Sequence, residues 1–72
     1  MEVRLFATLR ENREKTVQVQ WYEGMDGYAL LATLGIPAEQ VSIFLINGRH
    51  SKFDTHLYDS DIIALFPPVG GG

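Results

Sequence analysis

The sequence predicts one α+β domain, in which a single short helix crosses a mixed β-sheet. Two observations carry this prediction: apolar and polar residues alternate near both ends of the chain, and a capped helical segment lies between them. The predicted order is strand, strand, helix, strand, strand, strand. The 72 residues are 46% hydrophobic and 21% charged, which suits one domain with one compact core.

Residues 2–9 and 16–22 alternate as half-buried strands do, and the polar residues 10–15 form the predicted loop between them. The N-terminal third of the chain is therefore a predicted antiparallel hairpin. The residues expected to point inward are Val3, Leu5 and Ala7 in the first strand and Val17, Val19 and Trp21 in the second. The outer face of the first strand carries Arg4, Phe6 and Thr8.

A short helix is predicted over residues 27–34, where Leu30, Leu31 and Leu34 recur at helical spacing. Asp26 precedes the helix and is its predicted N-cap, because its carboxylate can accept hydrogen bonds from the free N–H groups of the first turn. Gly35 suits the left-handed position that ends a helix, and Pro37 prevents continuation.

Three more strands are predicted in the C-terminal half. The apolar run 43–46 is followed by Asn47-Gly48, which favours a type I′ turn, and by a short strand over residues 49–53. After a turn at Asp59-Ser60, residues 61–66 form the last strand, which Pro67-Pro68 ends because proline donates no ladder hydrogen bond. The inward residues of the last strand are Ile63 and Leu65, and we expect both to be buried together with Val3, Leu5, Val17 and Leu30.

Composition excludes several classes of function. The net charge of −3 and the pI of about 5.1 argue against nucleic-acid binding, which needs a basic face. The absence of cysteine excludes a disulfide, a thiolate zinc site and an internal thiol nucleophile. No apolar run approaches the ~20 residues that span a bilayer, and no signal peptide is recognisable, so the expected compartment is the cytoplasm, without membrane contact.

The other polar candidates have plainer interpretations. His50 and His56 lack further ligands at a recognisable spacing, so we expect no metal site. Asp54, Asp59 and Asp61 lie at predicted turns, where Asp is favoured for local hydrogen bonds.

The last residues, Gly70, Gly71 and Gly72, follow Phe66-Pro67-Pro68-Val69. A run of glycines loses too much backbone entropy to build packed structure, and taken alone it is as well explained by a frayed terminus. The two prolines favour a functional tail over a frayed terminus, because they stiffen the chain where it leaves the sheet. Fully extended, residues 67–72 span roughly 20 Å, enough to carry the terminal carboxylate into another protein.

The C-terminal sequence resembles a known family. Its matching residues are Ile46-Asn47-Gly48-Arg49, Phe53-Asp54, Leu57, Asp59-Ser60-Asp61 and the run from Ile62 to Gly72 with its F-P-P-V-x-G-G ending. This pattern is similar to the small subunit of molybdopterin synthase and, more distantly, to the thiazole-forming carriers, within the family of ubiquitin-like sulfur carriers. The resemblance implies a β-grasp domain over residues 1–66 and a flexible tail over residues 67–72.

The resemblance also implies a carrier that is not catalytic alone. A partner adenylyltransferase, related to ubiquitin-activating enzymes, would use ATP and Mg²⁺ to adenylate Gly72, while this chain binds no cofactor. A sulfur donor such as a cysteine desulfurase or a rhodanese would then convert Gly72 to a thiocarboxylate. The molybdopterin synthase large subunit would take up the loaded tail, and the threading residues are Pro67, Pro68, Val69, Gly70 and Gly71.

A docking surface is predicted beside the tail. Phe6, Ala64 and Phe66 lie on the polar faces of the first and last strands, and these strands are adjacent and parallel in the implied fold. Leu45 belongs to a continuous apolar run, whose periodicity does not say which way it faces. The resemblance supports a partner contact at this face.

Three other functions are compatible with the sequence. The carrier can serve thiamine, tRNA thiolation or another pathway. The chain can be a protein modifier that is amide-linked to lysine through Gly72. It can also be a β-grasp binding module with an inert tail, although its acidity disfavours RNA.

Overall fold

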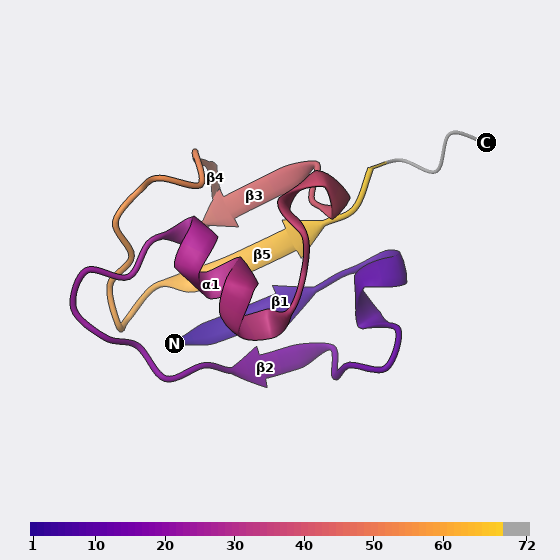
Figure 1. Cartoon of the computed structure of the whole chain (residues 1–72), viewed down its shortest axis with the longest axis horizontal. Coiled ribbons are helices and arrows are strands. Elements are labelled where there is room, and N and C mark those ends of the chain that lie inside the picture. The colour runs from indigo at the N-terminus through magenta and orange to yellow at the C-terminus, as the bar shows by residue number, and fades with distance from the viewer. Residues whose placement is uncertain (69–72) are drawn as a thin grey trace.

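The computed structural model describes residues 1–68, and within them five strands form one mixed sheet in the order β2-β1-β5-β3-β4. The neighbouring strands β1 and β5 run parallel, and the β1–β2, β3–β5 and β3–β4 pairs are antiparallel. The helix α1 (Gly27–Leu34) crosses one face of the sheet (Figure 1). This is the predicted α+β, β-grasp arrangement. The strands are β1 (Glu2–Leu5), β2 (Thr16–Gln18), β3 (Ile43–Ile46), β4 (Arg49–His50) and β5 (Ile62–Phe66).

The core lies between the sheet and α1. The parallel register sets Val3 beside Ile63 and Leu5 beside Leu65, and all four side chains are fully buried. Leu30 closes this layer from the helix and is also fully buried. Five of the six predicted core residues are therefore confirmed. Val17 is only half-buried, because it lies on the edge strand β2.

The helix begins and ends as predicted. The Asp26 carboxylate accepts a hydrogen bond from the Ala29 N–H at 2.9 Å, and Gly35 ends the helix with φ of 71°. Its first residue, Gly27, is required by a long-range contact rather than by the helix. A Cβ there would lie 2.6 Å from the Phe53 carbonyl oxygen, which accepts from the Tyr28 N–H.

We expect Gly27→Ala to destabilise the domain. Alanine gains about 1 kcal/mol of helix propensity, but overpacking against rigid backbone costs about 1–3 kcal/mol and disturbs the Tyr28–Phe53 hydrogen bond. Urea denaturation should show a net loss of up to about 2 kcal/mol. Thr33→Ala, at an exposed position of the same helix, is the control and should be nearly neutral. A stabilised Gly27→Ala would contradict the close packing.

The β3–β4 hairpin turns at Asn47-Gly48, whose φ angles of 52° and 83° confirm the predicted turn. The Asn47 side chain also fastens β5: Oδ1 accepts from the Ile62 N–H at 2.8 Å, and Nδ2 donates to Asp61 at 2.9 Å. The other Asp61 oxygen accepts from the Tyr58 N–H at 2.9 Å. The buried Asp61 is thus a structural residue, as its position at a turn predicted.

Several strand ends differ from the prediction. The first strand ends at Leu5 instead of residue 9, because Ala7 adopts φ of 53° and starts the 3-10 helix η1 (Ala7–Arg10). Ala7 is consequently exposed, and Leu9 turns back into the core. Phe6 still extends the ladder by donating to the Leu65 carbonyl.

The second and fourth strands are also shorter than predicted. β2 ends at Gln18 because β1 begins opposite, at Glu2; Val19 nevertheless stays buried, and Trp21 donates to the Leu57 carbonyl at 2.7 Å. β4 ends at His50, and the chain after it turns Phe53 toward Phe44 at a ring distance of 5.1 Å. A second 3-10 helix, η2 (Ala38–Gln40), precedes β3.

Candidate functional site

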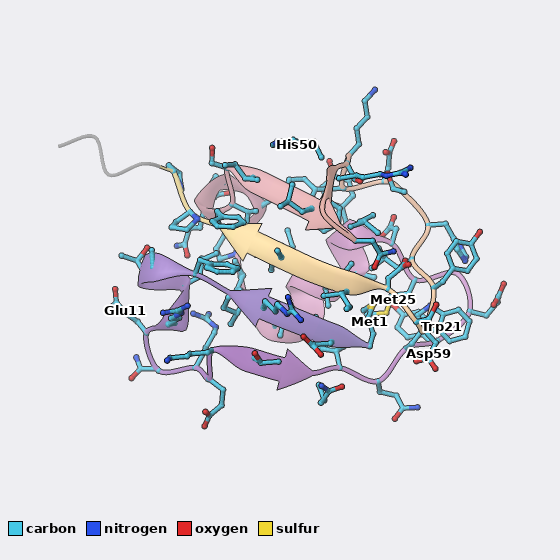
Figure 2. The ribbon with its side chains drawn as sticks, turned by 180° about the vertical axis from the view of Figure 1, so that it is seen from behind. Met1, Glu11, Trp21, Met25, His50 and Asp59 are labelled. Atoms are coloured by element: carbon cyan, nitrogen blue, oxygen red, sulfur yellow. The ribbon has the colours of Figure 1, made fainter. Side chains whose placement is uncertain are left out.

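An apolar patch lies on the face of the sheet opposite α1. Figure 2 views the molecule from this side, turned by 180° from Figure 1. Because successive residues of a strand point to opposite faces, residues next to Leu5, Ile63 and Leu65 in sequence face outward. The members of this outer patch are Phe6, Ile43, Leu45, Ala64 and Phe66. All five side chains are half-buried. The structure therefore brings the three predicted docking residues together and adds two from β3.

The cross-strand register explains why the outer patch is continuous. Ala64 lies opposite Leu45, and Phe66 lies opposite Ile43. The Phe6 and Phe66 rings stack with centroids 4.2 Å apart and planes 8° apart. Leu45 thus joins the patch. The sequence alone did not say which way this residue faces.

Arg10 belongs to the loop predicted over residues 10–15, and the sequence did not place it beside the predicted docking residues. The helix η1 returns it to the sheet, where Nε donates to the Leu5 carbonyl at 2.8 Å. Its guanidinium carbon lies 5.4 Å from the centroid of the Phe6 ring, a cation–π distance. The sequence signal for this contact was that Arg10 follows the aromatic residue Phe6 by four positions. The outer patch consequently has a cationic rim at its tail end.

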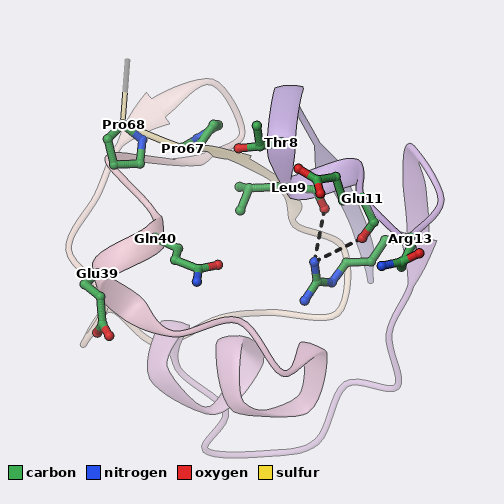
Figure 3. A pocket seen from close by; sticks show the side chains of 9 residues that line it. Thr8, Leu9, Glu11, Arg13, Glu39, Gln40, Pro67 and Pro68 are labelled. Carbon is green, nitrogen blue, oxygen red and sulfur yellow. Dashed lines mark hydrogen bonds between the residues drawn. The ribbon is translucent and has the colours of Figure 1, made fainter. Parts of the chain in front are cut away.

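The chain leaves the sheet beside the outer patch. Phe66 is the last residue of β5, and Pro67 and Pro68 follow it along a groove of about 520 Å³ (Figure 3). Thr8, Leu9 and Glu39 line the same groove, and Arg13 stabilises one wall by donating to the Leu9 and Glu11 carbonyls at 3.5 and 3.4 Å. The point where the described chain leaves the sheet is therefore adjacent to the outer patch, of which Phe66 is a member.

The remaining predicted site residues are Val69, Gly70, Gly71 and Gly72, which lie outside the described residues. Their roles stay predictions. Pro67 is half-buried and Pro68 exposed, so the described chain leads to the surface at this point.

The polar candidates do not gather into a metal-binding group in the described chain. No group of three or more His, Asp or Glu side chains within residues 1–68 is arranged to hold a metal ion. His56 packs against Tyr58 with ring centroids 4.7 Å apart, and His50 is exposed on β4. Over the same residues, no helix has the length and apolarity needed to cross a membrane.

A five-stranded β-grasp sheet, with one helix on one face and an apolar patch beside the chain exit on the other, defines a ubiquitin-like protein. The family comparison identifies which group of these proteins it is. Residues 3–72 match the ThiS family model, and the chain belongs to this family of ubiquitin-like sulfur carriers. No curated protein sequence matches the chain.

Solved structures agree with this assignment. SAMP1 from Haloferax volcanii is 30% identical with a TM-score of 0.75, and the alignment covers 99% of this chain and 97% of that one. A chain in the complex of subunits 1 and 2 of molybdopterin-converting factor from Helicobacter pylori is 28% identical with a TM-score of 0.65, over 99% and 96% of the two chains. A putative molybdopterin converting factor subunit 1 from Pyrococcus furiosus, 23% identical with a TM-score of 0.78 over 94% and 95%, supports the fold.

Proposed function

We propose that this chain carries sulfur for molybdopterin synthesis, as a thiocarboxylate on Gly72. The observation that supports this most is the outer patch, which ends where the chain leaves the sheet. A carrier needs this combination, because its partner must grip the domain while the tail reaches a reaction centre. The 28% identity to a chain of the Helicobacter pylori two-subunit complex supports a second subunit as one such partner.

The first step activates Gly72, because a carboxylate is a poor electrophile. A partner adenylyltransferase joins the Gly72 carboxylate to the AMP part of ATP, with Mg²⁺, and pyrophosphate leaves. The sulfur of a persulfide donor, such as a cysteine desulfurase or rhodanese, then attacks the acyl carbon and AMP leaves. Reduction of the resulting acyl disulfide by a thiol releases the donor and completes the Gly72 thiocarboxylate.

The second step delivers the sulfur. The outer patch docks on the large subunit, and residues 67–72 thread toward its bound cyclic pyranopterin. The thiocarboxylate sulfur is the nucleophile, whereas the large subunit supplies the substrate pocket and the proton transfers. This chain therefore contributes a reactive end group and a docking surface, not an active site, and we expect it to work in the cytoplasm.

A protein modifier is the second candidate function. The likeness to Haloferax volcanii SAMP1, which is named small archaeal modifier protein 1, specifically favours it. The activation of Gly72 would be the same, but a lysine amine would attack the acyl carbon and leave the chain amide-linked. Sulfur delivery to thiamine or tRNA is a further alternative that differs only in its acceptor.

A sulfur-tracing experiment distinguishes these functions. The chain is loaded with isotopically labelled sulfur and mixed with a molybdopterin synthase large subunit and cyclic pyranopterin. The proposal expects the label to enter the pterin while the chain returns to its unloaded mass. Label that stays on the chain, with lysine conjugates forming in an extract, would instead support the modifier function.

Phe66→Asp should weaken binding to the large subunit by roughly 2 kcal/mol or more, about 30-fold, because it places a charge in the centre of an apolar contact. Calorimetry measures the affinity, and the unfolding midpoint should change little because Phe66 lies outside the core cluster. Tyr22→Asp is the matched control at a 50%-exposed position away from the patch. Equal affinities of Phe66→Asp and wild type would remove the outer patch from the interface.

A further inference from the structure

Arg10 is held in a defined orientation at the edge of the outer patch. Its Nε donates to the Leu5 carbonyl at 2.8 Å, and its guanidinium carbon lies 5.4 Å from the centroid of the Phe6 ring. The Phe6 ring in turn stacks on the ring of Phe66. The backbone hydrogen bond and the contact with the ring together orient the guanidinium before any partner binds, so less side-chain entropy is lost on binding.

The guanidinium of Arg10 keeps one edge for another group. An arginine side chain has five N–H donors, and the Leu5 carbonyl takes the donor at Nε. Within residues 1–68 the Arg10 side chain makes no other hydrogen bond and no salt bridge. The remaining edge carries Nη1 and Nη2, and these two groups together match the two oxygens of a carboxylate.

The neighbouring charges on this face of the sheet do not supply that carboxylate. Glu2 and Arg4 have the same strand parity as Phe6, and they pair with each other at 2.6 Å. Arg10 is therefore an unbalanced cation on the predicted docking face of a chain whose net charge is −3. This net charge disfavours a nucleic acid as the source of the anion, and the apolar residues of the outer patch favour a protein surface.

A protein that covers the outer patch also takes Arg10 out of water. Arg10 is exposed in the free chain, but it lies over Phe6, a member of the patch. Burying a charge without a counter-charge is strongly unfavourable. A partner with only apolar side chains opposite the patch would consequently bind poorly, whereas a carboxylate at the Nη edge forms a charge-assisted pair.

We propose that Arg10 is a recognition residue: the protein that covers Phe6 and Phe66 places an aspartate or glutamate carboxylate on the Nη1–Nη2 edge of Arg10. The partner surface that fits is apolar at its centre and carries this carboxylate at the side nearest the chain exit. The inference rests on the proposed function, since it takes the molybdopterin synthase large subunit as the protein that covers the patch.

Calorimetry with the large subunit tests the role of the charge. Arg10→Met keeps an unbranched apolar side chain without the guanidinium, and it should bind about tenfold to a hundredfold more weakly, as expected when a charged hydrogen-bonded pair is lost. Arg10→Lys keeps the charge but not the planar fork, so its affinity should lie between those of Arg10→Met and wild type. Wild-type affinity of a folded Arg10→Met would refute the proposal.

Lys52→Met is the matched control for the change in net charge. Lys52 is exposed and lines a groove with Tyr28 of α1, away from the outer patch. This variant should bind the large subunit like wild type. A loss as large as that of Arg10→Met would mean that the net charge of the chain, and not the pairing of Arg10, sets the affinity.

A double-mutant cycle separates pairing from a purely structural role of Arg10 at the Leu5 carbonyl. Aspartates and glutamates of the large subunit are changed one at a time to asparagine and glutamine. One change should weaken binding of the wild-type chain about tenfold or more, but binding of Arg10→Met less than about threefold. The absence of any coupled carboxylate would overturn the proposal. If Arg10→Met does not fold, Arg10→Lys takes its place in the cycle.

The terminal carboxylate of the chain itself is the alternative source of the anion. In a chain whose C-terminus is amidated, the effect of Arg10→Met on binding should persist; its disappearance would assign the anion to this chain and overturn the proposal. Failure of the proposed function looks different. A wild-type chain that does not bind the large subunit would contradict that function and this inference together, whereas binding that Phe66→Asp weakens and Arg10→Met does not would contradict this inference alone.

Discussion

Deleting Gly72 is expected to abolish sulfur loading and to leave the unfolding midpoint of the protein unchanged. Loading is lost because the carboxylate of the shortened chain lies one residue, about 3.3–3.6 Å, short of the site where it meets ATP, and near-attack geometry tolerates only small displacements. Stability is kept because the buried core cluster ends at Leu65. Intact mass after incubation with the adenylating enzyme, ATP and a sulfur donor measures loading, and thermal unfolding measures stability.

One further tail variant and one control test whether loading depends on the position of the terminal carboxylate or only on its presence. Adding one residue after Gly72 should be equally damaging, because it moves the carboxylate past the same site. Tyr22→Asp, which leaves the tail intact, should be loaded normally. Normal loading of both tail variants would show that the end of the chain is not the reactive group.

Leu65→Ala is expected to cost about 2–5 kcal/mol of unfolding free energy, the range for buried leucines that leave a cavity. Leu65 is fully buried on the central strand β5, between Leu5 of β1 and Phe44 of β3. Small domains have about 5–15 kcal/mol in total, so this is a large fraction. Ile62→Ala, at a 37%-exposed position of the same strand, is the matched control and should lose much less. If urea denaturation gave equal losses of unfolding free energy for Leu65→Ala and Ile62→Ala, the two faces of β5 would not differ in burial as described.

Elements defined by local chemistry were predictable from the sequence. Asp26 and Gly35 bound α1 because capping depends on residues within one turn of the helix. Asn47-Gly48 forms the predicted turn because both residues tolerate positive φ. The order of elements then followed, and with it the fold.

Features that depend on distant residues were not predictable in the same way. The end of β2 is set by where β1 begins. The need for Gly27 arises from Phe53, which is far along the chain. None of these contacts leaves a periodic signal.

The candidate site shows the same division. Phe6, Ala64 and Phe66 were correctly placed on one face because the parity of a strand fixes the side of each residue. Arg10 was not, because only the η1 turn brings it to the Phe6 ring.

The central claim is that Gly72 is the reactive end of the molecule, and intact mass spectrometry of the wild-type chain tests it most directly. After incubation with the adenylating enzyme, ATP, Mg²⁺ and a persulfide donor, the account predicts a species heavier by about 16 Da, the replacement of one carboxylate oxygen by sulfur. Fragmentation should place the added mass on Gly72. A chain that keeps its original mass under these conditions, while it binds the enzyme through the outer patch, would contradict the account.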